Sequence, residues 1–302
     1  MKNKKRTIMI IIILIVAALI VGAMFWLAGF VMTGKRQTQK EAMTWQSEHY
    51  DTTYYDPLEK EEYTVEGNEG YILHVEFLKN PESSDKYIIL SHGYTDTRYG
   101  TLKYVKMYLD LGYNCIIYDL RGHGDNESTF TTYGILESKD LMKLIEDTRN
   151  RYDNLRVLGL HGESLGAAST ITALQYKPDV DFVVADCGFA DIEGVLKLGY
   201  KNAGVPVFLV DMADIGARLR YGYALKDMRP IDALKENTIP ILFLHGEDDA
   251  FIIPENSYRM YDVTKGIKDI HTIPEAGHAF SAIVNPELYH QYVEEFLTKL
   301  GV

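Results

Sequence analysis

Short apolar runs alternate with segments of helical periodicity along most of this chain, and that alternation restricts the possible folds more than any other feature. Runs that are apolar throughout suit strands buried on both faces of a parallel sheet. Strand–helix–strand units of this kind are right-handed, and several of them build a doubly wound α/β sheet. Strands are predicted at 71–77, 86–90, 113–120, 155–160, 181–186, 240–245 and 268–273. Helices are predicted at 100–111, 136–151, 165–177, 255–264 and 286–300.

Residues 190–230 interrupt the alternation. They include GVPVFLVDMADIGARLRYGYALKDM, which is rich in apolar and aromatic residues and contains no clear strand. An insertion between the strands at 181–186 and 240–245 is a natural lid over a site. A packing helix pair explains the same pattern equally well, so both interpretations stay open here.

The N-terminal part of the chain contains a run of 25 residues without a charge, from Ile8 to Met32. A helix that crosses a bilayer needs roughly 20 such residues. Basic residues flank the run, four before it and two directly after it, and they favour a cytoplasmic N-terminus. The small residues Val21, Gly22 and Ala23 would also suit the cleavage site of a signal peptide. The apolar run continues well past them, which favours an uncleaved anchor.

These features predict three parts of the chain. A membrane anchor is expected at 1–34, a polar tether at 35–62, and an α/β catalytic domain at 63–302 with a cap insertion at about 190–230. The protein would cross the cell membrane once, with its catalytic domain outside the cytoplasm.

The net charge of the chain is −12 and is unevenly distributed. The first 40 residues carry seven basic and no acidic side chains, whereas the rest carry 24 basic against 43 acidic ones. An acidic body argues against nucleic acid as a partner, since nucleic-acid binding needs a basic face. The two cysteines, Cys115 and Cys187, are too few for a disulfide framework and are expected to be buried free thiols.

The strongest functional signal is the pentapeptide Gly162-Glu163-Ser164-Leu165-Gly166. It follows a predicted buried strand directly and opens a predicted helix, which is the context of a nucleophile elbow. A serine on such a sharp turn projects beyond the end of the sheet, where side chains two positions before and after it would collide. Ser164 is therefore the candidate nucleophile.

A serine hydroxyl needs a base, and the chain has nine histidines from which to choose it. His278 lies in the segment EAGHAF, just after the last predicted strand, and a loop there can reach the same crevice as the elbow. It is the candidate base. His92 and His123 border glycines in other loops and are interpreted as loop-shaping hydrogen bonders, and packing roles are expected for His161 and His245.

The acid of such a site holds the imidazole in one tautomer. The segment LHGEDD follows the strand at 240–245 and supplies Asp248 and Asp249. The chain order Ser, Asp, His fits this architecture. Asp249 is the first candidate and Asp248 the alternative, with Asp186 and Asp191, after the preceding strand, as more distant ones.

The developing oxyanion needs two backbone donors. One is expected from the amide of Leu165, next to the nucleophile. The other is expected from the loop after the strand at 86–90, where Gly93 permits a tight turn and the amide of Tyr94 becomes the donor.

Together these segments resemble the α/β-hydrolase superfamily, and within it the serine aminopeptidase-like branch, especially membrane-anchored or exported hydrolases of Gram-positive bacteria. The resemblance covers roughly residues 63–300 and is carried by SHGYTDT (91–97), YDLRGHGDNES (118–128), HGESLGAAS (161–169), PIDAL (230–234), LHGEDDAF (244–251) and EAGHAFS (275–281). It implies an eight-stranded, mostly parallel sheet with flanking helices and a small cap. It also implies a triad of Ser164, Asp249 and His278, oxyanion amides at Tyr94 and Leu165, and neither a metal nor a cofactor.

Two details qualify the resemblance. Similar proteins usually have a proline four residues after the acid, whereas Pro254 comes five after Asp249, so Asp248 stays open. The family's sheet order places the strands of Cys115 and Cys187 about three spacings, ~14 Å, apart. A disulfide needs Cα atoms within roughly 7 Å, so the two should not be bridged.

The sequence is compatible with three functions. The first is an esterase-like hydrolase that cleaves carboxylic ester or thioester bonds through an acyl-enzyme. The second is a peptidase acting on short peptides, and the third is a non-catalytic binding protein on the same fold. The complete Ser-Asp-His set argues against the third. The apolar 195–222 segment and the anchor favour a small acyl or ester substrate, including lipid-like ones.

Overall fold

The computed structural model describes residues 2–302, so Met1 of the predicted anchor lies outside it. The chain divides into two compact units. The larger unit contains Lys35–Asp191 and Arg229–Val302, and the smaller contains the chain up to Gly34 together with Ile192–Met228.

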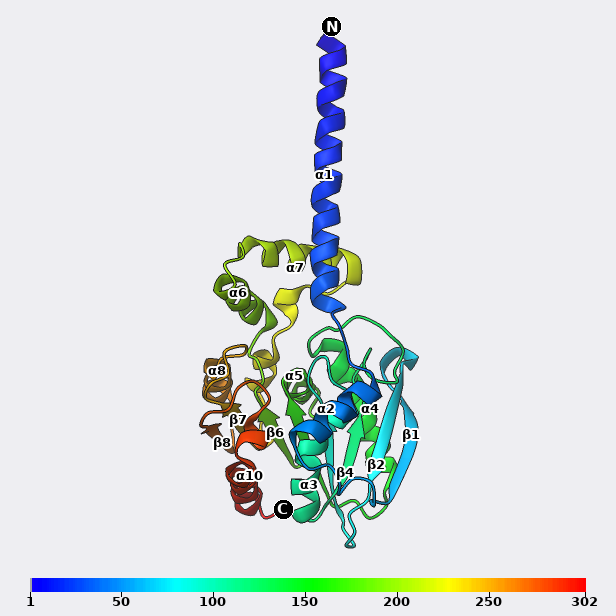
Figure 1. The fold of residues 1–302 in the computed structure, drawn as a ribbon, viewed down its shortest axis with the longest axis vertical. Helices are drawn as coiled ribbons and strands as arrows, with labels where there is room; N and C mark the ends of the chain where they lie inside the picture. The colour runs from blue at the N-terminus through cyan, green and yellow to red at the C-terminus, as the bar shows by residue number, and fades with distance from the viewer. Residues whose placement is uncertain (1) are drawn as a thin grey trace. The chain divides into compact units, whose positions relative to one another are not determined.

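The larger unit is built on an eight-stranded sheet in the order β1-β2-β4-β3-β5-β6-β7-β8. Figure 1 shows the strands of this sheet as arrows with helices beside them. Strand β2 pairs antiparallel with β1 and β4, and all the other pairs are parallel. The predicted α/β fold with a mostly parallel sheet is confirmed. The strands are β1 (Lys60–Glu66), β2 (Ile72–Leu78), β3 (Lys86–Ser91), β4 (Tyr113–Tyr118), β5 (Val157–Glu163), β6 (Phe182–Asp186), β7 (Ile241–Gly246) and β8 (Lys268–Ile273).

Helices flank this sheet. One core layer forms where Tyr108 and Phe296, from α3 and α10, pack with the strand residue Ile88. The side chain of Ile89 points to the opposite face because strand side chains alternate, and α5 packs on β3, β5 and β6. The helices of this unit are α2 (Gln39–His49), α3 (Leu102–Asp110), α4 (Ile135–Arg151), α5 (Leu165–Ala173), α8 (Glu255–Val263), α9 (Ser281–Val284) and α10 (Pro286–Leu300).

Parallel pairing brings the carboxyl ends of β3, β5, β6, β7 and β8 to one edge of the sheet. The loops that leave these ends are the usual place for a ligand in an open α/β sheet. They carry every candidate residue of the site, so the topology alone brings together segments more than 100 residues apart.

Residues 35–62, expected to be a polar tether, contain α2 and the start of β1 and belong to the larger unit. Helix α2 begins with a capping box. The Thr38 hydroxyl accepts from the Glu41 amide at 3.3 Å, and the Glu41 carboxylate accepts from the Thr38 amide at 2.8 Å. Ala42 and Gln46 on this helix are fully buried.

The smaller unit contains α1 (Lys2–Met32), α6 (Ile192–Asn202) and α7 (Phe208–Tyr221). Within residues 2–302, α1 is the single helix that is long and apolar enough to cross a membrane. Its last turns pack on α7, where a Cβ on Gly216 would lie 2.1 Å from the carbonyl oxygen of Met24. Only a glycine allows the two backbones to approach so closely.

Candidate active site

Ser164 occupies a sharp turn between β5 and α5. Its backbone has φ 52° and ψ −110°, a conformation that costs free energy for a residue with a side chain. A Cβ on Gly162 would lie 2.3 Å from the carbonyl oxygen of Gly166, and a Cβ on Gly166 would lie 2.1 Å from that of Ser91. Both glycines are therefore required by close backbone contacts, which agrees with the steric argument made from the sequence.

A row of hydrogen bonds joins Ser164, His278 and Asp249. The Nε2 atom of His278 lies 2.9 Å from Ser164 Oγ, and its Nδ1 atom lies 2.7 Å from Asp249 Oδ2. The Asp249 carboxylate can only accept, so Nδ1 carries the proton of the neutral imidazole. Nε2 is then unprotonated and accepts from the serine hydroxyl, which is the arrangement that a general base requires.

The Asp249 carboxylate is fixed from several sides in a buried position. Its Oδ1 atom accepts from the amides of Phe251 and Ile252 at 2.9 and 2.8 Å. Burial opposes ionisation, but hydrogen bonds from His245 and His278 outweigh it and hold the pKa of Asp249 well below its usual value. Asp249 is therefore ionised at neutral pH.

The other candidate acids lie elsewhere. Asp248, the neighbour that sequence reasoning kept open, is exposed. Asp186 is buried beside Tyr104, with 2.9 Å between its Oδ2 atom and the Tyr104 hydroxyl. Asp191 accepts from Arg259 at 2.9 Å. The structure thus brings Asp249, and none of these three, into hydrogen-bond contact with His278.

His245 is a second imidazole on the same carboxylate, and sequence reasoning assigned it only a packing role. Its Nε2 atom lies 2.6 Å from the carbonyl oxygen of Ile252 and 3.2 Å from Asp249 Oδ2. Because a carbonyl only accepts, Nε2 must carry a proton, and it is shared with the carboxylate. Nδ1 accepts from the Ser257 hydroxyl at 2.7 Å. His245 therefore helps to hold the Asp249 carboxylate in place.

The loop after β3 passes beside Ser164. A Cβ on Gly93 would lie 3.7 Å from the Cβ of Ser164 and 2.9 Å from the Glu163 carboxylate. This places the segment with the Tyr94 amide next to the elbow, where the Leu165 amide begins α5. Gly93 therefore leaves room for the Glu163 carboxylate beside it, whereas the left-handed residue of this loop is Thr95, with a φ of 71°.

His92 connects this loop with the loop after β4, in the loop-shaping role expected from the sequence. Its Nδ1–H donates to the carbonyl oxygen of Gly93 at 2.7 Å, and its Nε2 accepts from the amide of Leu120 at 2.9 Å. Burial lowers the pKa of His92, so the ring stays neutral at physiological pH. His123 behaves similarly, with burial lowering its pKa and its Nδ1 on the carbonyl oxygen of Arg121 at 2.9 Å.

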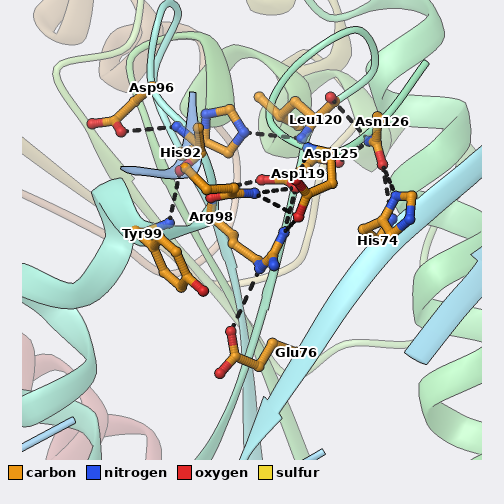
Figure 2. Close-up of polar contacts among 12 residues, drawn as sticks. His74, Glu76, His92, Asp96, Arg98, Tyr99, Asp119, Leu120, Asp125 and Asn126 are labelled. Carbon is orange, nitrogen blue, oxygen red and sulfur yellow. Dashed lines mark hydrogen bonds and ion pairs between the residues drawn. The ribbon is translucent and has the colours of Figure 1, made fainter. Parts of the chain in front are cut away.

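Arg98 lies at the far end of the loop after β3 and contacts several carboxylates, as Figure 2 shows. Its buried guanidinium lies 2.6 Å from the carboxylate of Asp119, 2.9 Å from that of Asp125 and 3.5 Å from that of Glu76. Its backbone amide also donates to Asp119 at 2.8 Å. These contacts fix the segment that follows Tyr94 to the end of β4.

Lys103 and Glu163 form a buried ion pair that sequence reasoning missed. The Lys103 ammonium contacts the carboxylate of Glu163, the residue directly before Ser164. It also donates to the carbonyl oxygen of Ala279, directly after His278, at 2.9 Å. Burial works against the charge on Lys103, but Glu163 outweighs it, and the pKa of Lys103 lies above its usual value. The pair therefore links the two loops that carry Ser164 and His278.

The first residues of the larger unit also contact the loop after β3. The Gln37 amide donates to the carbonyl oxygen of Thr95 at 2.7 Å, and the Gln46 side chain donates to Asp96 at 3.1 Å. Thr95 has a φ of 71°, in the left-handed region. Arg36 donates to the carbonyl oxygen of Thr129 at 2.6 Å. The expected tether thus supports the loop that holds the candidate oxyanion donor.

Residues 100–300 match the sequence profile of the prolyl oligopeptidase family. The chain belongs to the prolyl oligopeptidase family. This is a family of serine hydrolases within the α/β-hydrolase superfamily. The resemblance to that superfamily inferred from the sequence motifs is therefore confirmed.

Relatives and structural neighbours of this chain agree with the fold. The uncharacterised protein YqkD of Bacillus subtilis is 32% identical over 259 residues, 82% of each chain. The esterase Pf2001 of Pyrococcus furiosus superposes with a TM-score of 0.68 at 23% identity, over 82% of this chain and 94% of its own. Est1E of Butyrivibrio proteoclasticus, solved with ferulic acid, superposes with a TM-score of 0.64 at 18% identity, over 79% of this chain and 98% of its own. At these identities the two solved structures establish a shared fold.

Proposed function

We propose that this chain is a membrane-anchored serine hydrolase that cleaves carboxylic ester or thioester bonds through an acyl-enzyme intermediate. Ser164 is the nucleophile, His278 the general base and Asp249 the acid that orients it. One observation carries the proposal: the hydrogen-bonded row from Ser164 Oγ through the His278 ring to Asp249, with distances of 2.9 and 2.7 Å.

The geometry supports a two-step reaction. Ser164 Oγ attacks the carbonyl carbon while its proton passes to His278 Nε2, and Asp249 stabilises the imidazolium that forms. The tetrahedral intermediate collapses, its bond to the alcohol or thiol breaks, and that leaving group takes the proton from Nε2. Water then attacks the acyl-enzyme with the same base, which releases the carboxylic acid and restores Ser164.

The amides of Tyr94 and Leu165 are the proposed donors to the oxyanion. Two features support this assignment: the approach of Gly93 to Ser164, and the start of α5 at Leu165. Backbone N–H groups at a helix N-terminus favour negative charge. The loss of one such donor would cost about 10²–10³ in rate.

Esters are the first candidate substrates, and short peptides are the second. The esterase description of Pf2001, and the ferulic acid bound to Est1E, favour an ester or another small acyl compound, including lipid-like ones. The name of the prolyl oligopeptidase family favours the peptide. Nothing in the acidic body favours nucleic acid as a partner.

A substrate panel tests the proposal. Wild type and Ser164→Ala are compared on p-nitrophenyl esters of increasing acyl length and on aminoacyl anilides. We expect ester turnover by wild type alone. Turnover of anilides without esters would reverse the order of the two candidates, and ester turnover that survives in Ser164→Ala would refute the assigned nucleophile.

The proposed location is a membrane that α1 crosses once, with the larger unit outside the cytoplasm. The length and composition of α1 support the crossing. The basic residues Lys2, Lys4, Lys5 and Arg6 before the apolar run support a cytoplasmic N-terminus.

A further inference from the structure

Helix α7 exposes a stripe of large apolar side chains. Phe208, Ile215 and Leu219 are 59%, 46% and 62% exposed. Their spacing of seven and four residues places them on one face of the helix, and the half-buried Met212 lies on the same face. A row of this kind on a globular surface marks a contact with another apolar phase.

The opposite face of α7 is already occupied. Val210, Ala213 and Ala217 are buried there, and Gly216 brings the α7 backbone against the carbonyl oxygen of Met24 in α1. The helix is therefore apolar on two sides. One side packs on α1 and the other remains open within the smaller unit.

The position of this contact along α1 suggests what covers the open side. A helix rises 1.5 Å per residue, so a hydrocarbon layer of ~30 Å takes about 20 residues. The apolar run begins at Ile8, and about 20 residues counted from there end near Leu27. Helix α7 meets α1 at this level, through Met24 and through a hydrogen bond of 3.1 Å from Arg220 to the carbonyl oxygen of Phe25.

Two exposed aromatic residues mark the same level of α1. Trp26 and Phe30 are 68% and 65% exposed, and their ring centroids lie 6.0 Å apart. Trp and Tyr gather at the boundary between hydrocarbon and headgroups because their rings are amphipathic, so Trp26 is the residue that favours this level. On the flank of the α7 stripe, the exposed Arg218 guanidinium lies 2.6 Å from the carboxylate of Asp227, so this flank of the helix is polar.

We propose that α7 lies in the outer interface of the bilayer that α1 crosses, with Phe208, Ile215 and Leu219 among the acyl chains. The inference rests on the proposed anchor but not on the catalytic assignment. The smaller unit then contacts lipid through two helices, one across the bilayer and one along its surface.

Site-specific quenching tests this placement on the full chain in vesicles of phosphatidylcholine and phosphatidylglycerol. The native Cys115 and Cys187 are buried, and burial raises their thiol pKa values, so a maleimide dye labels only an introduced cysteine. Ile215→Cys and Leu219→Cys report on the stripe. Leu14→Cys, in the middle of α1, reports on insertion, and Glu61→Cys, exposed on β1, is the aqueous control. A Ser164→Ala background makes the readout independent of activity.

Lipids with a nitroxide near the headgroup should quench the dyes at 215 and 219 by more than about half, since an interfacial helix lies about 5–10 Å deep. Lipids with a nitroxide midway along the acyl chain should quench the dye at 14, because that residue lies within the hydrocarbon layer. The dye at 61 should keep its emission. Quenching at 14 with none at 215 and 219 would overturn the inference while leaving the anchor in place. Disulfides between copies through Ile215→Cys, without lipid quenching, would identify a second copy as the occupant and would equally overturn it. A dye at 14 that lipid does not quench would refute the anchor and the inference together, whatever the substrate panel gives.

Discussion

At the scale of single residues, the Asp249 carboxylate is held by two imidazoles and two backbone amides, whereas Asp248 is exposed. Asp249→Asn should reduce kcat for an ester by about 10³–10⁴, because the amide no longer fixes the His278 tautomer or stabilises its charged form. Asp248→Asn, the matched control, should stay close to wild type. A greater loss in the control would move the acid by one residue.

The buried pair of Lys103 and Glu163 offers a second prediction. Lys103→Met strands a buried carboxylate, and breaking such a pair costs ~3–5 kcal/mol, so the melting temperature in detergent should fall. It also removes the donor to Ala279, so kcat should fall more than KM changes.

The double variant Lys103→Met, Glu163→Gln separates these two effects. It removes both charges, so most of the melting temperature should return while kcat stays low. A double variant no more stable than Lys103→Met would contradict the role assigned to the pair.

Asp186 makes the stability of the fold depend on pH. Burial, helped by the Glu163 carboxylate, raises the pKa of Asp186 to about 6. Such a group binds its proton more tightly in the folded state than in the unfolded state. The free energy of unfolding therefore falls as pH rises from about 4 to about 6 and Asp186 loses its proton. The slope approaches ~1.4 kcal/mol for each pH unit. Asp186→Asn should melt close to wild type at pH 4 and above it at pH 7. A difference in melting temperature that does not change with pH would contradict the raised pKa of Asp186.

At the scale of elements, the segment after α1 contacts the loop of the proposed oxyanion donor Tyr94 through the backbone of Gln37. Gln37→Pro removes the N–H that donates to Thr95, whereas Gln37→Ala keeps it. One hydrogen bond is worth about 0.5–1.5 kcal/mol, so kcat of the proline variant should fall about two- to tenfold below that of the alanine variant. Equal kcat values for the two variants would show that this contact does not reach the site.

The strands from β2 to β8 could be predicted because each is a short, β-rich apolar run. Strands β3 to β7 are buried almost throughout, whereas β2 and β8 are only partly buried. Strand β1 could not, because its sequence KEEYTVE is charged and mostly exposed at the edge of the sheet. Helix α2 is polar and was therefore expected to be part of a tether, although the capping box of Thr38 and Glu41 could have revealed it.

For the site as well, the sequence reveals local patterns but not the contacts between distant residues. Local strand-turn-helix and loop patterns singled out Ser164, His278 and Asp249, and the structure brings these three into one hydrogen-bonded row, while their catalytic roles stay predictions. Lys103 had no such signal, since its partners Glu163 and Ala279 are distant in the sequence and meet only through the fold. Contacts between residues that are distant in the sequence produce no periodic pattern in it.

At the scale of the whole molecule, the orientation in the membrane can be measured with thiol labelling of intact cells. The expected topology exposes Glu61→Cys to a membrane-impermeant maleimide and hides Lys5→Cys until the cells are permeabilised. The buried native cysteines give no background. Labelling of Lys5→Cys but not of Glu61→Cys in intact cells would show the opposite topology.

The role of Ser164 as nucleophile can be tested by labelling the full chain with a fluorophosphonate, followed by mass spectrometry of the modified peptide. An activated serine reacts with such a probe because its neighbouring base takes the proton. We expect one adduct, on Ser164, in wild type and none in Ser164→Ala. No adduct in wild type, or equal labelling of both proteins, would contradict this role.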